Sequence, residues 1–348
     1  MAQKNSGAIE LPVIDVTNTD MDTARQLIDA VATHGFVYLK NNKDEIPNEE
    51  IDRLFDLSAR FFKSPIEIKQ TCAVGSGESG KNSGWFGMNT EKLDPEKQKR
   101  GDFKECFNMN EFKDGKAQQP LPPPLLENAD QLDLFWKRCL GLCHRVLELF
   151  AMGLQVDGRA GGKDFFRPYH DPANGPSGSV LRLLYYPTLA PSEKYDEETD
   201  IRAGAHSDYG TITLLFQRPG QPGLEILTSR GGDPDERWYP VPVNPTNEPH
   251  VPILLNVGDA LNFWTDGLLK STVHRVIFPK DHVGEDRYSI AYFCHAVDDA
   301  KFEPIPSGVV RQHRETVNGG TNGTTEPLTA KQHLESRLAA TYASSLRK

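Results

Sequence analysis

The sequence predicts a mainly β protein with flanking helices, whose core is an antiparallel barrel or a jelly roll. The first observation behind this prediction is a series of short β-type runs between residues 179 and 297, separated by Gly, Pro, Asn and Asp. The second is a long helical pattern that precedes them, and the third is a mixed α/β pattern at the start of the chain. At 348 residues with 37% hydrophobic content, the chain can bury a large core.

The first 70 residues alternate between strand and helix patterns. Residues 11–16 (LPVIDV) form a short apolar run typical of a strand, residues 20–33 have the apolar spacing of a helix, and residues 34–41 (HGFVYLKN) predict a second strand. A second helix is expected from about Asn48, which suits an N-cap, and Pro65 ends it. These patterns predict a small α/β layer.

The middle of the chain changes from loop-like to helical. Residues 73–119 are rich in Gly, Lys and Asp, which favours long surface loops over a core, and loops of that length often act as lids. Residues 129–154 form the longest helical pattern, with one broad apolar stripe that we expect to pack on a sheet. The residues of this stripe are Leu132, Phe135, Trp136, Cys139, Cys143, Val146 and Leu147.

The β-type runs are followed by a polar segment at residues 311–325 and a helical pattern at residues 327–346. The runs themselves are VLRLLYYP, AGAHSDYG, TITLLFQ, GLEILT, VPILLNVGDALNFW, STVHRVIF and RYSIAYF. We therefore divide the chain into an N-terminal α/β region with loops (1–125), a helix and connecting loop that pack on the core (126–178), the jelly-roll core (179–300), and a linker with a C-terminal helix (301–348).

Composition argues against nucleic acid and membranes as partners. A formal charge of −10 provides no general attraction for a polyanion, so we expect a small-molecule substrate and no nucleic acid. No apolar run has the length of a signal peptide or a membrane span, so we expect a cytoplasmic protein that does not bind membranes. The five cysteines are scattered without paired metal spacing and are expected to be reduced thiols. The sequence predicts no particular oligomeric state.

A candidate metal site lies in the β-rich part. Side chains two apart on a strand share a face, so His206 and Asp208 project together while Ser207 points away. His274 follows 68 residues later in another β-run, far enough for intervening strands to return it beside the first pair. Two imidazoles and one carboxylate on one side of a metal form the facial triad of iron(II) oxygenases, whereas zinc usually prefers a closed tetrahedron or one open position.

A candidate anion site follows on the next β-run. Arg287 and Ser289 share one face of RYSIAYF with Ala291 and Phe293. A buried guanidinium presents a planar fork of donors to a carboxylate and stays charged, and a Ser hydroxyl adds another donor. The alternative is an arginine at a strand edge that pairs with a surface acid.

A third polar pair lies on VLRLLYYP. Arg182, Leu184 and Tyr186 share one face, and if that face looks inward, Arg182 and Tyr186 supply further contacts to a bound acid. The alternative is a core tyrosine with an arginine that extends along the surface to water.

With these residues identified, the sequence resembles the isopenicillin N synthase-like branch of the iron(II)/2-oxoglutarate-dependent dioxygenases, over about residues 10–297. The resemblance is carried by LPVIDV, GFVYLKN and FFKSPIEIK near the start and by H-x-D, H-R-V and R-x-S in the β-rich part. Leu184 stands where plant members commonly have Asn, and Arg182 resembles an arginine of microbial members. The Gly-rich loop and residues 157–178 also look like fungal or bacterial members. The resemblance implies a double-stranded β-helix flanked by helices.

The resemblance also implies the cofactors and the roles of these residues. His206, Asp208 and His274 would bind iron(II), and Arg287 with Ser289 would hold the distal carboxylate of 2-oxoglutarate, with Tyr186 and Arg182 as further contacts. Dioxygen and 2-oxoglutarate would then oxidise a C–H bond of the substrate, with hydroxylation as the default and release of succinate and carbon dioxide. Two alternatives remain open: an oxidase that does not use 2-oxoglutarate, and a catalytically silent module that binds iron or 2-oxoglutarate.

Two aromatic residues suggest the kind of substrate. Tyr209 follows Asp208, and Phe293 shares the face of Arg287, so both rings are expected to border the space next to the metal. Opposed rings favour a flat or ring-containing molecule, such as a nucleobase or a fungal secondary metabolite. The alternative is that both rings pack only within the barrel wall.

Overall fold

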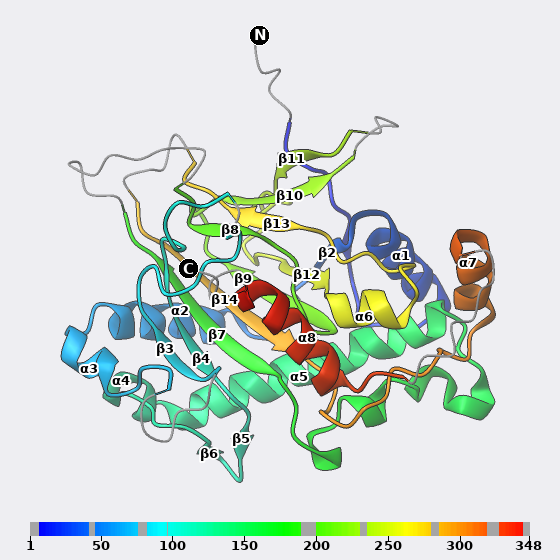
Figure 1. Ribbon diagram of the computed structural model, residues 1–348, viewed down its shortest axis with the longest axis horizontal. Coiled ribbons are helices and arrows are strands. Elements are labelled where there is room, and N and C mark those ends of the chain that lie inside the picture. The colour runs from blue at the N-terminus through cyan, green and yellow to red at the C-terminus, as the bar shows by residue number, and fades with distance from the viewer. Residues whose placement is uncertain are drawn as a thin grey trace.

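Two β-sheets form the centre of the protein (Figure 1), whose computed structural model describes residues 7–41, 46–75, 82–95, 97–188, 200–229, 235–279, 285–318 and 327–343. The larger sheet has the order β1 (Val13–Ile14), β2 (Phe36–Leu39), β12 (Ile253–Val257), β9 (Ile212–Gln217), β14 (Arg287–Cys294), β7 (Val180–Tyr186), β4 (Glu105–Met109) and β3 (Gly84–Phe86). The smaller sheet has the order β11 (Arg237–Pro240), β10 (Leu224–Thr228), β13 (His274–Val276) and β8 (Ala203–His206). A separate hairpin joins β5 (Phe112–Lys113) and β6 (Lys116–Ala117).

Helices flank this core, as the sequence predicts. They are α1 (Met21–His34), α2 (Asn48–Phe62), α3 (Ile66–Gln70), α4 (Pro123–Leu126), α5 (Ala129–Gly153), α6 (Asp259–Trp264), α7 (Gly308–Asn318) and α8 (Ala330–Ala343). Four short 3-10 turns, η1 (Gly158–Ala160), η2 (Gly162–Asp164), η3 (Arg167–Tyr169) and η4 (Pro172–Asn174), connect α5 to β7. Within the described residues, no helix is both long and apolar enough to cross a membrane.

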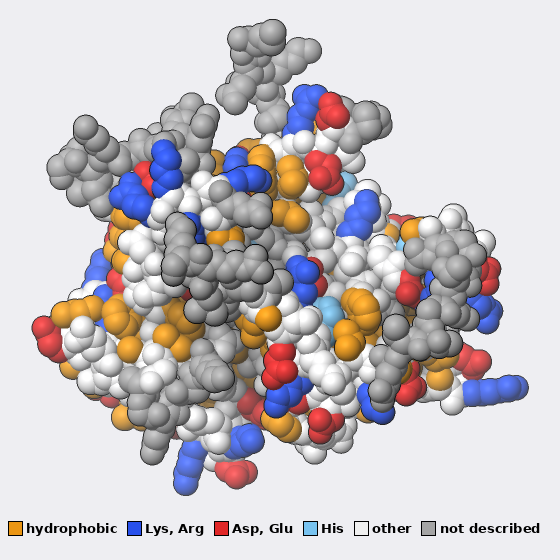
Figure 2. All heavy atoms as spheres, viewed as in Figure 1, with side chains coloured by type: hydrophobic (Ala, Val, Ile, Leu, Met, Phe, Trp, Pro, Cys, Tyr) orange, Lys and Arg blue, Asp and Glu red, His pale blue; other side chains and the backbone are white. Residues whose placement is uncertain are grey.

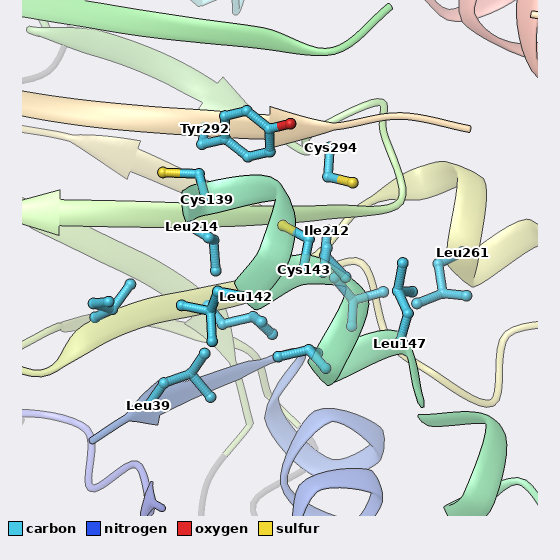
Figure 3. Close-up of a cluster of buried hydrophobic side chains, with 14 of the residues drawn as sticks. Leu39, Cys139, Leu142, Cys143, Leu147, Ile212, Leu214, Leu261, Tyr292 and Cys294 are labelled. Carbon is cyan, nitrogen blue, oxygen red and sulfur yellow. The ribbon is translucent and has the colours of Figure 1, made fainter. Parts of the chain in front are cut away.

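The long helix α5 packs on the larger sheet through the predicted apolar stripe. Figure 3 shows Cys139 and Cys143 of α5 directed toward Tyr292 and Cys294 of β14. Trp136 meets the ring of Tyr292 edge-on, with 5.2 Å between the centroids. All seven residues of the stripe are buried, and burial raises the pKa of the Cys139 and Cys143 thiols well above the usual value, so both stay protonated. The prediction that the stripe forms core is confirmed.

The first helix is bounded by side-chain chemistry that the sequence contains. The Asp20 side chain accepts a hydrogen bond from the Thr23 amide at 2.8 Å and caps the start of α1. Gly35 ends the helix with a φ of +70°, in close contact with the backbone of Lys270 and the side chain of Thr272. Because a side chain at Gly35 would collide with these atoms, glycine lets β2 start at once and pair with β12.

The expectation of surface loops over residues 73–119 is wrong for the second half of that range. β4 lies between β7 and β3 in the larger sheet, and all five of its residues are buried. Its charged residue, Glu105, is paired with Lys69, whose Nζ atom lies 2.8 Å from Oε2. The charges that indicate a loop are therefore paired inside the protein, and composition alone does not reveal such pairing.

Three smaller expectations also need correction. Asn48 is the first residue of α2 rather than its cap, and its side-chain oxygen accepts from Asn41 Nδ2 at 2.9 Å. The segment DALNFW, expected as strand, forms α6, because Gly258 and the turn that follows β12 break the sheet pairing. Residues 311–318 of the expected linker belong to α7, and residues 319–325 lie outside the described residues.

Candidate metal centre and its cavity

The three predicted metal-binding residues meet at one edge of the smaller sheet. His206 ends β8 and pairs with His274, the first residue of β13, and Asp208 lies two residues beyond β8. Asp208 Oδ1 is 3.9 Å from His206 Nε2 and 3.7 Å from His274 Nε2. All three ligand atoms lie within 4.8 Å of one another, which one metal ion can span.

Backbone carbonyls orient both imidazoles. His206 Nδ1 donates to the Gly204 carbonyl at 2.7 Å, and His274 Nδ1 donates to the Thr272 carbonyl at 3.1 Å. These bonds place the proton on Nδ1, which leaves Nε2 with a lone pair directed at the common centre. Burial, and then the proximity of His274, lowers the pKa of His206 to about 3, so this imidazole is neutral at physiological pH.

Two residues that the sequence reasoning misses hold the carboxylate of Asp208. Thr213 Oγ1 and Asn256 Nδ2 both donate to Oδ2, each at 2.7 Å, which leaves Oδ1 toward the imidazoles. Burial opposes ionisation, but the two imidazoles and these two donors outweigh it, so the pKa of Asp208 lies below its usual value. A signal for Asn256 exists, because a lone amide interrupts the apolar strand β12.

The loop after Asp208 is fixed by the start of α6. The Asp259 amide donates to the Asp208 carbonyl at 2.7 Å, and the Ala260 amide donates to the Gly210 carbonyl at 3.1 Å. Gly258 is in backbone contact with Gly210, and a side chain at either position would collide with its surroundings. The loop that carries Asp208 is therefore held through its backbone as well as through its side chains.

The predicted anion site is buried on the larger sheet. Arg287 is 2% exposed and lies opposite Tyr186 across β14 and β7, with its guanidinium carbon 4.9 Å from the ring centroid. Arg287 donates to Ser289 Oγ at 3.3 Å and to the Gln221 carbonyl at 3.2 Å. Within the described part of the chain, no carboxylate lies within ion-pair distance of Arg287. The alternative of an edge arginine with a surface acid is thus wrong.

One cavity connects the metal centre to the anion site. Its volume is about 150 Å³, and its walls include the three candidate metal-binding residues, Arg287 and Ser289. Tyr209 and Phe293 also line it, together with the candidate metal-binding residues. All of the candidate residues from the sequence therefore face the same space, including Tyr186 and Arg182.

Arg182 is held on the cavity wall by polar residues from the region expected to form loops. Its Nε donates to Asn108 Oδ1 at 2.6 Å, and Nη2 lies 3.5 Å from Glu91 Oε1. Glu91 also pairs with buried Lys104 at 3.3 Å. Burial opposes the charge of Glu91, but Arg182 and Lys104 lower the pKa of this carboxyl to about 2. The sequence reasoning misses Glu91, Lys104 and Asn108 because the composition of residues 73–119 is that of surface loops.

Comparison with known proteins gives matches over nearly the whole chain. The family described as "2OG-Fe(II) oxygenase superfamily" matches residues 177–296, and "non-haem dioxygenase in morphine synthesis N-terminal" matches residues 11–127. UPF0676 protein C1494.01 of Schizosaccharomyces pombe is 38% identical over 90% of both chains. Proline hydroxylase buaE of Petromyces alliaceus is 30% identical over 91% of this chain and 92% of its own length.

The fold is also similar to solved structures. The crystal structure of a full-length Neurospora crassa protein in complex with alpha-KG (2-oxoglutarate) and thymine has a TM-score of 0.73 and 27% identity. The match covers 98% of this chain and 99% of that chain. This similarity confirms the predicted jelly-roll core with flanking helices.

Proposed function

Because this chain belongs to the 2OG-Fe(II) oxygenase superfamily, we propose that His206, Asp208 and His274 bind its iron(II) ion and that Arg287 and Ser289 bind 2-oxoglutarate. The protein is an iron(II)- and 2-oxoglutarate-dependent dioxygenase with dioxygen as co-substrate. With iron(II) and 2-oxoglutarate bound, such a site couples decarboxylation of 2-oxoglutarate to succinate with oxidation of a substrate C–H bond. The residues of this chain would supply binding and orientation.

The donor set suits iron(II). Two imidazoles and one ionised carboxylate offer Nε2, Nε2 and Oδ1 to a common centre on the wall of the cavity. The carbonyls of Gly204 and Thr272 orient the imidazoles, and Thr213 with Asn256 orients the carboxylate. An ion bound here would keep open positions toward the cavity.

The observation that carries the 2-oxoglutarate assignment is the buried guanidinium of Arg287. Burial lowers its pKa, although Tyr186 opposes this, yet an arginine stays cationic in proteins. A buried cation without a carboxylate among the described residues calls for an anionic ligand, and 2-oxoglutarate carries a second carboxylate to fill this role. Ser289 adds a hydroxyl donor, and the ring of Tyr186 packs on the guanidinium.

For the substrate we propose a small ring-containing molecule that is oxidised, most simply by hydroxylation. Tyr209 and Phe293 place two aromatic rings on the wall of a cavity of about 150 Å³, and an engineered cavity of that order binds benzene. Arg182, held by Glu91 and Asn108, places polar groups on the same wall for a carbonyl or carboxylate of the substrate or of 2-oxoglutarate. The relatives named above include a proline hydroxylase and a protein crystallised with thymine, both with ring-containing compounds in their descriptions.

We also propose that the protein acts on free small molecules in the cytoplasm and not on nucleic acid. Its formal charge is −10, and on the face in Figure 2 the described Lys and Arg side chains are interspersed with Asp and Glu. The four-part division at residues 125, 178 and 300 is likewise a proposal.

Succinate formation tests the proposed function. Purified protein is given iron(II), 2-oxoglutarate and air with a panel of ring-containing metabolites, and succinate is measured with each component omitted in turn. We expect succinate to require iron(II) and 2-oxoglutarate, and His274→Ala to abolish both succinate and tight metal binding. His313→Ala, a histidine on α7, is the matched control.

Each alternative predicts a different outcome. Product formation without 2-oxoglutarate would favour an oxidase in which Arg287 holds the substrate itself. Binding of iron and 2-oxoglutarate without any turnover would favour the silent binding module. Full activity with unchanged metal content in His274→Ala would contradict the assigned metal site.

A further inference from the structure

The C-terminal helix α8 forms part of the cavity wall. Leu334 and Leu338 lie four residues apart, on one face of α8, and both line the cavity together with the metal-binding residues. Figure 1 shows α8 next to α6, which it contacts. Apart from these leucines, most side chains of α8 before residue 340 are polar, and Lys331, Gln332, Glu335 and Ser336 are exposed.

The first turn of α8 is anchored to the body of the protein. The Ala330 amide donates to the Ala300 carbonyl at 2.8 Å, and the Lys331 amide donates to the Asp298 carbonyl at 3.1 Å. The His333 ring packs beside Phe263 and Phe302, with centroid distances of 5.5 and 5.7 Å. These contacts fix the start of the helix without involving the cavity.

The second half of α8 is attached at the metal-binding loop. Arg337 Nη2 lies 2.6 Å from Asp259 Oδ2 and donates to Ser207 Oγ at 3.4 Å. The guanidinium carbon lies 5.9 Å from the ring centroid of Tyr209. Ser207 and Tyr209 flank Asp208, so Arg337 contacts both neighbours of a metal-binding residue.

Asp259 connects Arg337 to both segments that carry metal-binding residues. Its Oδ2 accepts from Ser207 at 3.0 Å, and its Oδ1 accepts from Ser271 at 2.7 Å, three residues before His274. Its amide holds the Asp208 carbonyl, as described above. The attachment of α8 is therefore built on the same carboxylate that braces the metal site.

We propose that α8 is a wall of the substrate cavity that is held in place by a latch, the ion pair of Arg337 with Asp259. Arg337 is thus a positioning residue, and Leu334 and Leu338 limit the size of the substrate. The inference rests on the proposed function in taking this cavity as the substrate site. These two leucines of α8 would thus determine which substrates reach the metal ion, although they are not ligands of it. The pair of Arg337 with Asp259 is partly exposed, with 43% and 13% of the two side chains accessible, so the latch can open.

Proteolysis of the full chain at Glu335 tests the latch. Endoprotease Glu-C cuts after glutamate, and cleavage after Glu335, followed by intact-mass analysis, reports how often α8 opens. We expect Arg337→Met to accelerate this cleavage about two- to fivefold, as suits a partly exposed ion pair, and Arg337→Lys to restore most of the protection. Lys331→Met removes a charge from the anchored turn and serves as the matched control.

The latch also predicts how two substitutions combine. Asp259→Asn should accelerate cleavage at Glu335, and adding Arg337→Met to it should accelerate cleavage no further, because both remove the same contact. Wild-type cleavage rates in Arg337→Met, or equal acceleration by Lys331→Met, would overturn the latch. Neither result depends on any bound molecule, so the latch can fail while the proposed function stands.

Two ring probes test the role of the leucines. Protein loaded with Mn(II) and 2-oxoglutarate is titrated with thymine and with the larger 2-naphthol, in the wild type, Leu338→Ala and Leu338→Trp. We expect Leu338→Ala to bind 2-naphthol at least about fivefold more tightly relative to thymine, and Leu338→Trp to shift the ratio the other way. An equal ratio in all three proteins, including no binding to any, would overturn the size role. Absence of 2-oxoglutarate binding would instead count against the proposed function.

Discussion

Replacing Arg287 by leucine should separate ligand binding from folding. Arg287 is buried, and its partners are a serine, a backbone carbonyl and a tyrosine ring rather than an acid. Removing a buried cation that has no acid among the described residues relieves a desolvation cost. We therefore expect the free energy of unfolding without 2-oxoglutarate to fall by less than about 3 kcal/mol, the loss of two hydrogen bonds, or to rise.

Binding of 2-oxoglutarate should respond in the opposite way. Loss of one partner of a buried charge pair costs roughly 2–5 kcal/mol, so Kd should rise by a factor between about 30 and several thousand. Ser289→Ala should cost only about 0.5–1.5 kcal/mol, because it removes a single neutral donor at 3.3 Å from the guanidinium. Arg218→Leu, at a partly exposed arginine that pairs with Asp56 at 3.4 Å, is the control.

Calorimetric titration of Mn(II)-loaded protein with 2-oxoglutarate gives Kd, and urea unfolding gives the stability. An unchanged Kd in Arg287→Leu would refute the assignment of this arginine to 2-oxoglutarate. An unchanged Kd with weaker binding of the substrate would point to the oxidase alternative. Severe loss of stability without ligand would show instead that Arg287 has a structural partner.

Three further predictions concern the surroundings of the metal and the core. Asn256→Ala should weaken metal binding about 10- to 100-fold, because Asp208 Oδ2 loses a donor; unchanged metal affinity by calorimetry would contradict this. Phe293→Ala should raise the substrate KM by up to about tenfold and uncouple 2-oxoglutarate consumption from product, whereas unchanged KM and coupling in folded protein would assign the ring to the wall alone. Burial lowers the pKa of His170 to about 4, below its unfolded value of about 6.5, so the unfolded chain takes up the proton first as the pH falls. His170 should therefore cost stability between pH 6.5 and 4, by up to about 3 kcal/mol, and His170→Gln should flatten the pH dependence of urea unfolding; an identical pH dependence would refute this.

Much of the candidate site can be located from the sequence because most of its residues follow strand periodicity, although Asp208 lies beyond the end of β8. Arg287, Ser289 and Phe293 share a face of β14 by the period-two rule, and all three line the cavity. His206 and His274 are matched in the sequence only by residue type and separation, yet the pairing of β8 with β13 places them side by side. The sequence of a regular strand thus predicts which of its side chains share a face, even when the order of the strands in the sheet is unknown.

Several site residues that the sequence does not predict are charged residues whose partners lie in other segments of the chain. Lys104 and Glu91 look like surface residues, but inside the protein they neutralise each other, and burial opposes the charge of Lys104 while Asp102 and Glu91 raise its pKa. Arg337 carries no signal at all in the sequence, since its partner Asp259 is 78 residues away in another helix. Ion pairs between distant segments have no periodicity, so only the fold reveals them.

The N-terminal part of the chain contacts the proposed metal centre, so the proposed N-terminal region and the jelly-roll core are not independent of each other. Phe36 of β2 pairs with Asn256 of β12, whose amide holds Asp208. The ring of Phe36 also meets the His274 imidazole edge-on, with 5.5 Å between the centroids. A change in β2 would therefore alter both the orientation of the carboxylate and the packing of an imidazole. The proposed 2-oxoglutarate site depends less on this strand, because Arg287 lies on β14 between β9 and β7, away from β2 in the sheet order.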